Sequence, residues 1–397
     1  MLRFLTAGES HGPELTVIID GLPAGIPLKA SEIAEGLARR QKGEGSGGRM
    51  SIEKDHAKIT GGVMAGFTTG APVSMVIPNL DFSNWRDREV APMTVPRPGH
   101  ADLAAALKHG YKDLRVGLER ASARETAARV AMGVVCKKFL SQFGIVIGSH
   151  VIAIGTVQVP LIDVDDYCEI FERVERSPVR CVDEAASILM VQEIQRARNQ
   201  GDTLGGSFQC VGLNIPPGLG SHVQWDRRLS TRLFAALGSI PSVKAVQFGA
   251  AVGDSVLSGS EAHDAIVIKS DTGTDTLCRK TNRAGGVEGG ISNGMPLVVT
   301  ATMKPISTTS KGIASVDLIT REPRLTVYER SDTCAVPRAC IIGEAMMAFV
   351  VADALIEKVG GDSVGEMAPR FARLTSMRLD DIHLEGAPWR FAYELDL

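Results

Sequence analysis

The sequence lacks any long basic run and carries almost no net charge. Its 43 lysines and arginines face 46 aspartates and glutamates, which leaves a formal charge of −3. Nucleic-acid-binding chains usually show a basic excess or block, so we expect no nucleic-acid partner. The arginines form short clusters instead, at Arg39–Arg40, Arg86–Arg88, Arg120–Arg129 and Arg321–Arg330. Such clusters on a near-neutral chain indicate a small anionic ligand.

The sequence also lacks the features of a membrane or secreted protein. No apolar run approaches the roughly 18 residues that a membrane span needs. Residues 1–7 form too short an apolar stretch for a signal peptide. The seven cysteines are scattered and include no C-x-x-C pair. We expect them to be reduced and mostly buried, without a metal site, in a cytoplasmic protein with no membrane partner.

Several catalytic motifs are missing as well. The sequence has no G-x-S-x-G nucleophile elbow, no G-x-x-x-x-G-K-[ST] phosphate loop and no H-E-x-x-H metal pair. Gly43, Gly45 and Gly48 match G-x-G-x-x-G, but a helix is predicted before them where a dinucleotide fold requires a strand. Metal-dependent hydrolysis and NTP hydrolysis are therefore not supported.

The residues that are present predict a large α/β protein. Hydrophobic residues make up 44% of the 397 residues, enough for a sizeable core. Strand patterns alternate with helical ones, which favours the α/β class. In the helix predicted over 183–200, we expect Ile188, Leu189 and Val191 to face the core. The predicted strands are 14–20, 72–78 and 150–157. Further helices are predicted at 31–40 (capped by Ser31), 102–110, 164–174 and 229–237.

The stretch 119–129 combines a helix start with several arginines. Ser122 and Glu125 match an S-x-x-E capping box, and the apolar positions that follow predict a helix ending near Gly144. Cations at a helix N-terminus oppose the helix dipole, which favours anions there. A phosphate bound between the arginines and the helix would explain the pattern. The alternative is a capped helix whose arginines pair with Glu119, Glu125 or solvent.

The second half of the sequence repeats blocks of the first half in the same order. The Gly-rich turn at 61–72 matches the one at 285–296, and each enters a Val-rich strand. Glu119–Ser122 matches Glu329–Asp332, and each block precedes a long apolar helix. A third pair of Gly-containing segments precedes a strand in each half.

Three matching blocks in order indicate an internal duplication. We predict one domain over 1–397, built of two similar halves at about 1–150 and 200–360 and related by a pseudo-two-fold axis. Equivalent loops of the two halves would then meet at one shared site.

Two of the eight histidines lie in glycine-flanked loops. His11 lies within Gly-Glu-Ser-His-Gly, and His100 within Arg-Pro-Gly-His-Ala-Asp. Glycine lets a ligand approach the backbone closely, and histidine is the natural proton donor near neutral pH. A structural loop histidine remains the alternative for each. The residues alone thus indicate an enzyme with a phosphate-bearing ligand, but they do not define its reaction.

The longer motifs resemble those of the chorismate synthase family over nearly the whole chain. They are Gly8–Gly12, Arg39–Gln41, Arg97–Asp102, Glu119–Arg129, Thr281–Gly286 and Arg330–Pro337. The resemblance implies a β-α-β sandwich, a homotetramer and reduced FMN (FMNH2) as cofactor. It also implies 1,4-anti elimination of phosphate from 5-enolpyruvylshikimate 3-phosphate to give chorismate, the last common step toward the aromatic amino acids.

The resemblance also implies roles for individual residues. His11 would protonate the departing phosphate, His100 would keep the reduced flavin protonated, and Asp332 would help the flavin N5 act as a base. The implied substrate contacts are Ser10, Arg49, Arg97 and Arg330. The implied FMN contacts are Arg120, Ala121, Ser122, Pro241, Ser242, Gly289, Lys304, Pro305, Ile306, Ser307, Thr308 and Arg330.

The sequence departs from the family in the loop after Arg40. The family usually has Gly-Tyr-Gly-Arg-Gly there, whereas this chain has Gly43-Glu44-Gly45-Ser46-Gly47. The resemblance assigns Arg40 and position 46 to contacts with a nicotinamide nucleotide. Because Ser46 carries no cation and Glu44 adds an anion, we expect a weaker hold on anions at this loop.

The source of reduced flavin is a separate question. NADPH is a candidate source of reducing equivalents, and because no added reductase segment is evident we expect an external flavin reductase. Two alternatives stay open: an NADPH-dependent flavoprotein reductase, and a non-catalytic protein that binds FMN or another phospholigand.

Overall fold

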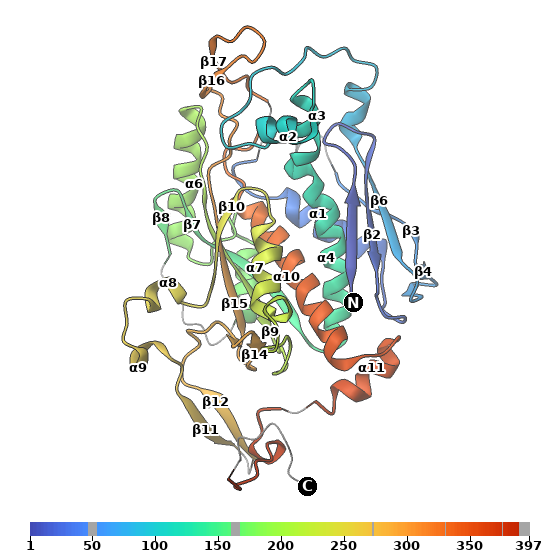
Figure 1. The fold of residues 1–397 in the computed structure, drawn as a ribbon, viewed down its shortest axis with the longest axis vertical. Coiled ribbons are helices and arrows are strands. Elements are labelled where there is room, and N and C mark those ends of the chain that lie inside the picture. Colours follow the sequence, from blue (N-terminus) through green and yellow to red (C-terminus); the bar gives the residue numbers. More distant parts are fainter. Residues whose placement is uncertain (47–53, 160–166, 272–273, 330, 375, 389–397) are drawn as a thin grey trace, which may run out of the picture.

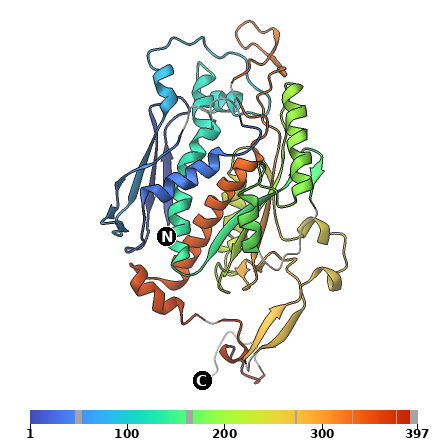
Figure 2. The same ribbon diagram turned by 180° about the vertical axis from the view of Figure 1, so that it is seen from behind.

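The structure is a computed structural model that describes residues 1–46, 54–159, 167–271, 274–329, 331–374 and 376–388. Two antiparallel sheets enclose a layer of helices (Figures 1 and 2). The first sheet has the order β1-β2-β6-β3 and the second β10-β15-β9-β7-β8. Their strands are β1 (Arg3–Ala7), β2 (Glu14–Asp20), β3 (Lys58–Gly61), β6 (Val73–Pro78), β7 (Val146–Ile154), β8 (Val157–Gln158), β9 (Gly206–Leu213), β10 (Val243–Phe248) and β15 (Leu297–Met303).

Four helices form the layer between the sheets. They are α1 (Ala30–Gln41), α4 (Thr126–Ser141), α7 (Leu229–Gly238) and α10 (Val336–Val359). α4 packs against the first sheet and α10 against the second, and the two helices pack against each other. Nearly the whole surface of α10 is buried, as expected for a helix that is apolar all round.

Shorter elements connect and extend these layers. The helical ones are η2 (Leu80–Asn84), α2 (Asp102–His109), α3 (Arg115–Ala121), η3 (Ala123–Glu125), α5 (Tyr167–Val174), α6 (Glu184–Asn199), η4 (Trp225–Arg227), α8 (Ala251–Asp254), α9 (Gly259–Ala262), α11 (Val364–Phe371) and η5 (Leu379–Asp381). The remaining strands form two-stranded pairs: β4 (Val63–Met64) with β5 (Phe67–Thr68), β11 (Ile266–Asp271) with β12 (Thr274–Arg279), β13 (Val287–Glu288) with β14 (Ile291–Ser292), and β16 (Ala314–Val316) with β17 (Pro323–Leu325).

By length and composition alone, α10 is long and apolar enough to cross a membrane. No such run was predicted, and Arg338, Glu344 and Asp353 interrupt the apolar stretches of this helix. In the structure, 89% of the most apolar 18-residue segment of α10 is buried inside the protein. Core helices can be equally long and apolar, and the burial of α10 identifies it as one.

The mixture of helices and strands agrees with the sequence analysis, and β2, β6, α2 and α7 lie close to their predicted bounds. The prediction of Ser122 as an N-cap is confirmed for η3, the 3-10 turn that leads directly into α4, but the capping box with Glu125 is not formed. Ser122 lies in extended backbone between α3 and η3, and α4 begins at Thr126. The Ser122 hydroxyl instead accepts from the Arg124 N–H, while the Glu125 carboxylate accepts from Thr6 and Arg129.

Two further helix predictions are wrong in detail. α1 begins at Ala30, and Lys29 rather than Ser31 occupies the N-cap position, with Glu32 accepting from the Lys29 N–H. On α6, Ile188 and Leu189 are 57% and 50% exposed, and the buried face carries Met190 and Ile194. The third predicted core residue, Val191, is half-buried and packs against the core as predicted. Ile188 and Leu189 were misplaced because both faces of α6 carry apolar residues.

The cysteine prediction is confirmed for the most part. No cysteine is disulfide-bonded, and Cys136, Cys181, Cys210, Cys334 and Cys340 are buried, whereas Cys168 is exposed and Cys278 is half-buried.

Close packing of α4 against α10 yields a stability prediction. A Cβ added to Gly133 in α4 would lie 2.2 Å from the Cβ of Ala345 in α10. We expect Gly133→Ala to lower the free energy of unfolding by about 1–3 kcal/mol, because the helices must separate to admit the methyl group. Gly238→Ala in α7 is the control, since its added Cβ meets no atom within 4 Å. Equal stabilities of the two variants in urea unfolding would contradict this packing.

Candidate active site

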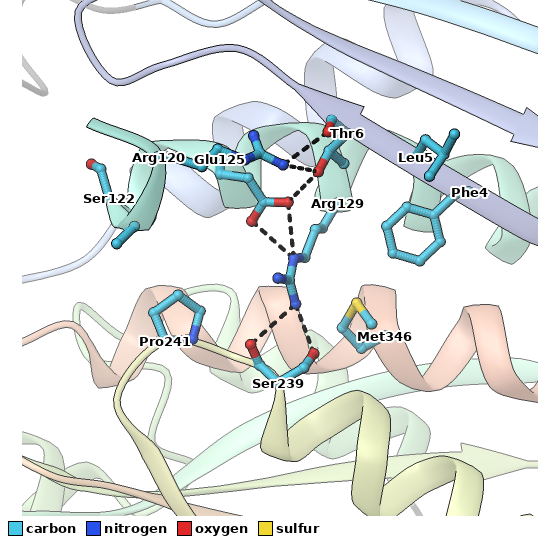
Figure 3. Close-up of a pocket in the computed structure, with 11 residues that line it drawn as sticks. Phe4, Leu5, Thr6, Arg120, Ser122, Glu125, Arg129, Ser239, Pro241 and Met346 are labelled. Carbon is cyan, nitrogen blue, oxygen red and sulfur yellow. Dashed lines mark hydrogen bonds and ion pairs between the residues drawn. The ribbon is translucent and has the colours of Figure 1, made fainter. Parts of the chain in front are cut away.

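A cavity of about 420 Å³ lies between the first sheet and the second half of the chain (Figure 3). β1 contributes one wall, the turn from α3 to α4 a second, and the segment after α7 a third. The lining residues are Phe4, Leu5, Thr6, Arg120, Ala121, Ser122, Glu125, Arg129, Ser239, Pro241 and Met346. Four of them, Arg120, Ala121, Ser122 and Pro241, are predicted FMN contacts. The structure thus brings together predicted residues from both halves of the sequence.

Arg120 is held at the cavity wall by the first strand. Its Nη1 donates to the Gly8 carbonyl at 3.0 Å, and its Nη2 donates to the Thr6 carbonyl at 2.8 Å. Nη2 also donates to the Thr6 hydroxyl at 2.9 Å. These neutral acceptors fix the guanidinium without neutralising it. Arg120 therefore keeps its positive charge for a ligand.

Arg129 joins the two halves across the same cavity, as Figure 3 shows. Its Nε donates to Glu125 at 2.9 Å, and its Nη1 donates to the Ser239 hydroxyl at 2.8 Å. Glu125 also accepts from the Thr6 hydroxyl at 2.6 Å. Arg129 thus ties α4 to the end of α7, and pairing with Glu125 offsets its charge.

His11 lies beside the cavity wall and is clamped by Glu119. Its Nδ1 lies 2.7 Å from Glu119 Oε1, and its backbone N–H donates to Oε2 at 2.8 Å. The His11 ring also lies against Trp85, with ring centroids 3.8 Å apart. Burial alone would raise the pKa of Glu119, but the hydrogen bonds from His11 outweigh it and lower that pKa. Glu119 is therefore a carboxylate when it faces the imidazole.

Ser10 and Ser122 connect the His11 loop to the cavity. The Ser122 hydroxyl lies 3.1 Å from the Ser10 hydroxyl, and the Ser10 N–H donates to the Glu119 carbonyl at 3.1 Å. The predicted substrate contact Ser10 and the predicted FMN contact Ser122 are thus neighbours.

His100 belongs to a second histidine–carboxylate pair. Its Nδ1 lies 2.6 Å from Asp102 Oδ1. Asp102 is completely buried and also accepts from Arg97 Nε at 2.8 Å and Nη2 at 2.9 Å. Burial alone would raise the pKa of Asp102, but Arg97 and His100 together hold it well below its usual range.

Arg97 links this pair to the loop that follows β15. Its Nη1 donates to the Thr308 hydroxyl at 2.9 Å. The guanidinium is buried among Asp102, Thr308 and His100, with Nη2 3.1 Å from His100 Nδ1. The predicted substrate contact Arg97 therefore orients other site residues in this structure.

The 304–308 loop lies beside the His100 loop. Lys304 Nζ donates to the Ser307 hydroxyl at 2.8 Å, and a Cβ added to Gly99 would lie 3.5 Å from that Nζ. Burial, together with nearby Lys244, lowers the pKa of Lys304. The Lys304 N–H donates to the Ser242 carbonyl at 3.0 Å. The loop thus connects Pro241–Ser242 at the cavity with His100.

Residues 43–46, where the sequence departs from the family pattern, pack against the segment around Asp332. The N–H of Thr333 donates to the Gly45 carbonyl at 2.8 Å, and Asp332 accepts from Arg338 at 2.5 Å. Ser46 donates to the Gly43 carbonyl at 2.7 Å. Glu44 pairs with Arg198 at 3.0 Å, so its charge is offset locally.

Arg40 is buried and holds the turn before α4. Its Nε donates to the Thr126 hydroxyl at 3.1 Å, and its Nη2 donates to the Ala123 carbonyl at 3.0 Å. Arg124 lies in the same buried cluster and donates to both oxygens of Asp55 at 2.7 Å. The structure therefore gives Arg40 an anchoring position under the cavity wall rather than one facing solvent.

One predicted contact, Gly289, remains apart from this arrangement, and two others are not among the described residues. Gly289 lies in the turn between β13 and β14, where the Leu229 N–H donates to Gly290 at the start of α7. Pro241 and Ser242 follow the other end of α7, about 15 Å along a helix of this length. Arg49 and Arg330 lie outside the described residues.

Sequence reasoning missed Asp102 and Trp85 as partners of the two histidines, and treated Glu119 only as a partner for arginine. Asp102 could have been predicted from the sequence, because it lies two residues after His100 in the same motif. Trp85 and Glu119 carry no local signal, since 74 and 108 residues separate them from His11.

Comparison with known proteins relates this geometry to a family. A family model described as chorismate synthase matches residues 2–356. A chorismate synthase of Desulforudis audaxviator is 49% identical over 385 residues, which are 94% of this chain and 97% of that protein. One of Aquifex aeolicus is 47% identical over 386 residues, covering 93% and 96%.

A solved structure agrees with these sequence relatives. The crystal structure of a chorismate synthase superposes with a TM-score of 0.76 at 42% identity, and the match covers 94% of this chain and 96% of that one. The chain therefore belongs to the chorismate synthase family, whose members are lyases of the shikimate pathway to aromatic amino acids.

Proposed function

We propose that this chain converts 5-enolpyruvylshikimate 3-phosphate to chorismate and phosphate, with reduced FMN bound in the cavity beside Arg120. One observation carries the proposal. The cavity lined by four of the predicted FMN contacts is linked to both histidine–carboxylate pairs, through the Ser122–Ser10 hydrogen bond on one side and through the 304–308 loop on the other.

The residues of the cavity fit a flavin mononucleotide. A volume of about 420 Å³ lies within the range of small-molecule sites. Arg120 and the hydroxyl of Ser122 can donate hydrogen bonds to a phosphate, while Phe4, Pro241 and Met346 offer apolar surface to a ring system. When bound, reduced FMN would supply a transient electron and a base for the ring hydrogen of the substrate.

The protein's own residues handle the phosphate and the protons. His11 Nε2 would donate a proton to the departing phosphate, while Glu119 stabilises the imidazolium. His100, held by Asp102, would keep a proton next to the cofactor. Asp332, paired with Arg338, would orient the basic nitrogen of the cofactor. These groups are fixed by the fold before the ligand arrives, so little reorganisation is needed during reaction.

Arginine roles divide into binding and positioning. Arg120 is a binding residue, because its guanidinium meets only neutral acceptors among the described residues. We assign Arg97 a positioning role through Asp102, His100 and Thr308, in addition to its predicted contact with the substrate. Arg49 and Arg330 remain predicted substrate contacts on the family resemblance.

The finer architecture is also part of the proposal. Each half contains a strand, a helix, a short hairpin, a second strand and a long helix in the same order: β2, α1, β4–β5, β6 and α4, then β9, α7, β13–β14, β15 and α10. We infer an internal duplication, which gives a β-α-β sandwich of two similar halves with a pseudo-two-fold axis.

The assembly and the cellular setting rest on the family resemblance. We propose a cytoplasmic homotetramer that takes reduced FMN from an external flavin reductase, with NADPH as the source of electrons.

An anaerobic assay with chemically reduced FMN tests the function. We expect chorismate and phosphate to form from 5-enolpyruvylshikimate 3-phosphate in equal amounts. A non-catalytic FMN-binding protein would form neither product. An NADPH-dependent reductase would oxidise NADPH in air without substrate, which we do not expect of this chain.

The loop at Ser46 gives a prediction about anion affinity. We expect Ser46→Arg to tighten binding of substrate and NADPH by up to about fivefold, because a new exposed ion pair contributes up to about 1 kcal/mol. Ser46→Gln is the control, since it adds length without charge. Equal dissociation constants for the two variants in isothermal titration calorimetry would contradict this reading of the loop.

A further inference from the structure

The surroundings of His11 include two side chains that contact its ring, Glu119 and Trp85. Trp85 has no role in the function proposed above, and Glu119 has only that of stabilising the imidazolium. Glu119 holds both the ring and the backbone of His11, at 2.7 and 2.8 Å. Trp85 lies against the ring at an interplanar angle of 34°, and its own Nε1 donates to the buried carboxylate of Asp81 at 3.1 Å. His11 is therefore fixed both at one edge and on one face.

We propose that Glu119 and Trp85 are positioning residues that make Nε2 the only nitrogen of His11 able to exchange a proton with the ligand. This inference rests on the proposed function. The Glu119 carboxylate accepts a hydrogen bond from Nδ1–H, so the neutral ring is kept as the Nδ1–H tautomer. Nε2 has no hydrogen-bond partner among the described residues, and Trp85 prevents the ring from turning over.

The proposal gives a balanced proton transfer. The His11 imidazolium gives its Nε2 proton to a phosphate oxygen, and the phosphate leaves with that proton. The ring is then neutral, with its remaining proton on Nδ1 hydrogen-bonded to the Glu119 carboxylate. Without this carboxylate, the neutral ring would populate the Nε2–H tautomer, which offers no empty site on Nε2 for reprotonation.

The other charged groups around this pair are consistent with that role. Arg115 is close enough to help lower the pKa of Glu119, and it also pairs with Glu329 at 3.5 Å. Arg88 lies over the Trp85 ring, 5.4 Å from its centroid. Among the described residues, the groups in direct contact with the His11 ring are thus one carboxylate and one neutral aromatic ring.

The test combines a spectroscopic and a kinetic measurement on the full chain. In protein labelled with 15N-histidine, we expect the neutral His11 of the wild type to carry its proton on Nδ1, with the signals assigned by His11→Asn. Glu119→Gln should shift the tautomer toward Nε2–H. It should also lower kcat of chorismate formation by about tenfold or more, with KM changed less than twofold.

Further variants separate positioning from folding. Glu119→Asp should retain the Nδ1–H tautomer and recover part of kcat, and Trp85→Phe should do so more fully than Trp85→Ala. Glu366→Gln on the surface of α11 is the matched control and should change neither readout. An unchanged tautomer in Glu119→Gln, or a changed tautomer without loss of kcat, would overturn the proposal. A wild type that makes no chorismate would overturn the proposed function instead, because the tautomer measurement needs no substrate.

Discussion

Replacing His11 by alanine is expected to slow chorismate formation by about 10²–10⁴-fold, the usual contribution of a positioned general acid. The variant removes the proton donor but leaves the cavity lining intact, since His11 is not among the residues that line it. Affinity for reduced FMN should therefore stay within about twofold. The measurement is the initial rate of chorismate formation under anaerobic conditions with saturating reduced FMN.

The His100→Ala variant should show a loss of similar size. His109→Ala is the control for both, because His109 is exposed on α2 and stacks on Tyr111, outside the site. Wild-type turnover in His11→Ala and His100→Ala together would refute the proton-transfer roles. If the loss in His11→Ala instead equals a loss of affinity for reduced FMN, His11 is a cofactor-binding residue and not the proton donor.

Asp102→Asn is expected to cost about 3 kcal/mol of folding free energy at neutral pH. The change removes the charge that compensates the buried guanidinium of Arg97, and an unpaired buried charge is strongly destabilising. His100 would lose its carboxylate partner at the same time, so the folded fraction should also turn over more slowly. Urea unfolding measures the first effect, and the rate per folded molecule measures the second.

The folding stability that the Asp102 carboxylate contributes depends on pH in a definite direction. The folded-state pKa of Asp102 lies well below the value of about 3.9 in an unfolded chain. Its stabilisation is therefore complete above about pH 5 and is lost as the pH falls below about 4. The difference in stability between the wild type and Asp102→Asn should shrink over that acidic range. Asp20→Asn, which breaks an exposed pair with Arg3, should cost less than about 1 kcal/mol, and an equal cost for Asp102→Asn would contradict the account.

Local patterns in the sequence predict the elements but not their partners. Alternating residues in β2 and the Gly110 stop after α2 are local signals, and both elements lie where they were predicted. Ile188 and Leu189 were placed on the wrong face, because which apolar face of α6 is covered depends on distant strands. Ser122 caps the turn before α4 as predicted, but its capping box with Glu125 is absent, since nothing nearby in the sequence reveals that Glu125 binds Thr6.

The contacts between site residues are also not predictable from local sequence patterns. Arg120, Ala121 and Ser122 were assigned to FMN on motif resemblance, and the structure lines one cavity with them, although their contact with FMN stays a prediction. The bond between Arg97 and Thr308 spans 211 residues, and only the folded chain brings such residues together. Arg40 is buried against Thr126 and Ala123, which no local pattern predicts, and its contact with a nicotinamide nucleotide stays a prediction.

The ratio of chorismate formed to reduced FMN oxidised tests the central proposal most directly. The elimination involves no net redox change, so the proposal predicts many molecules of chorismate and phosphate per FMN under anaerobic conditions, with the flavin still reduced at the end. The measurement combines flavin absorbance with product quantification in the same sample. One flavin oxidised per product, or no chorismate at all, would contradict the account.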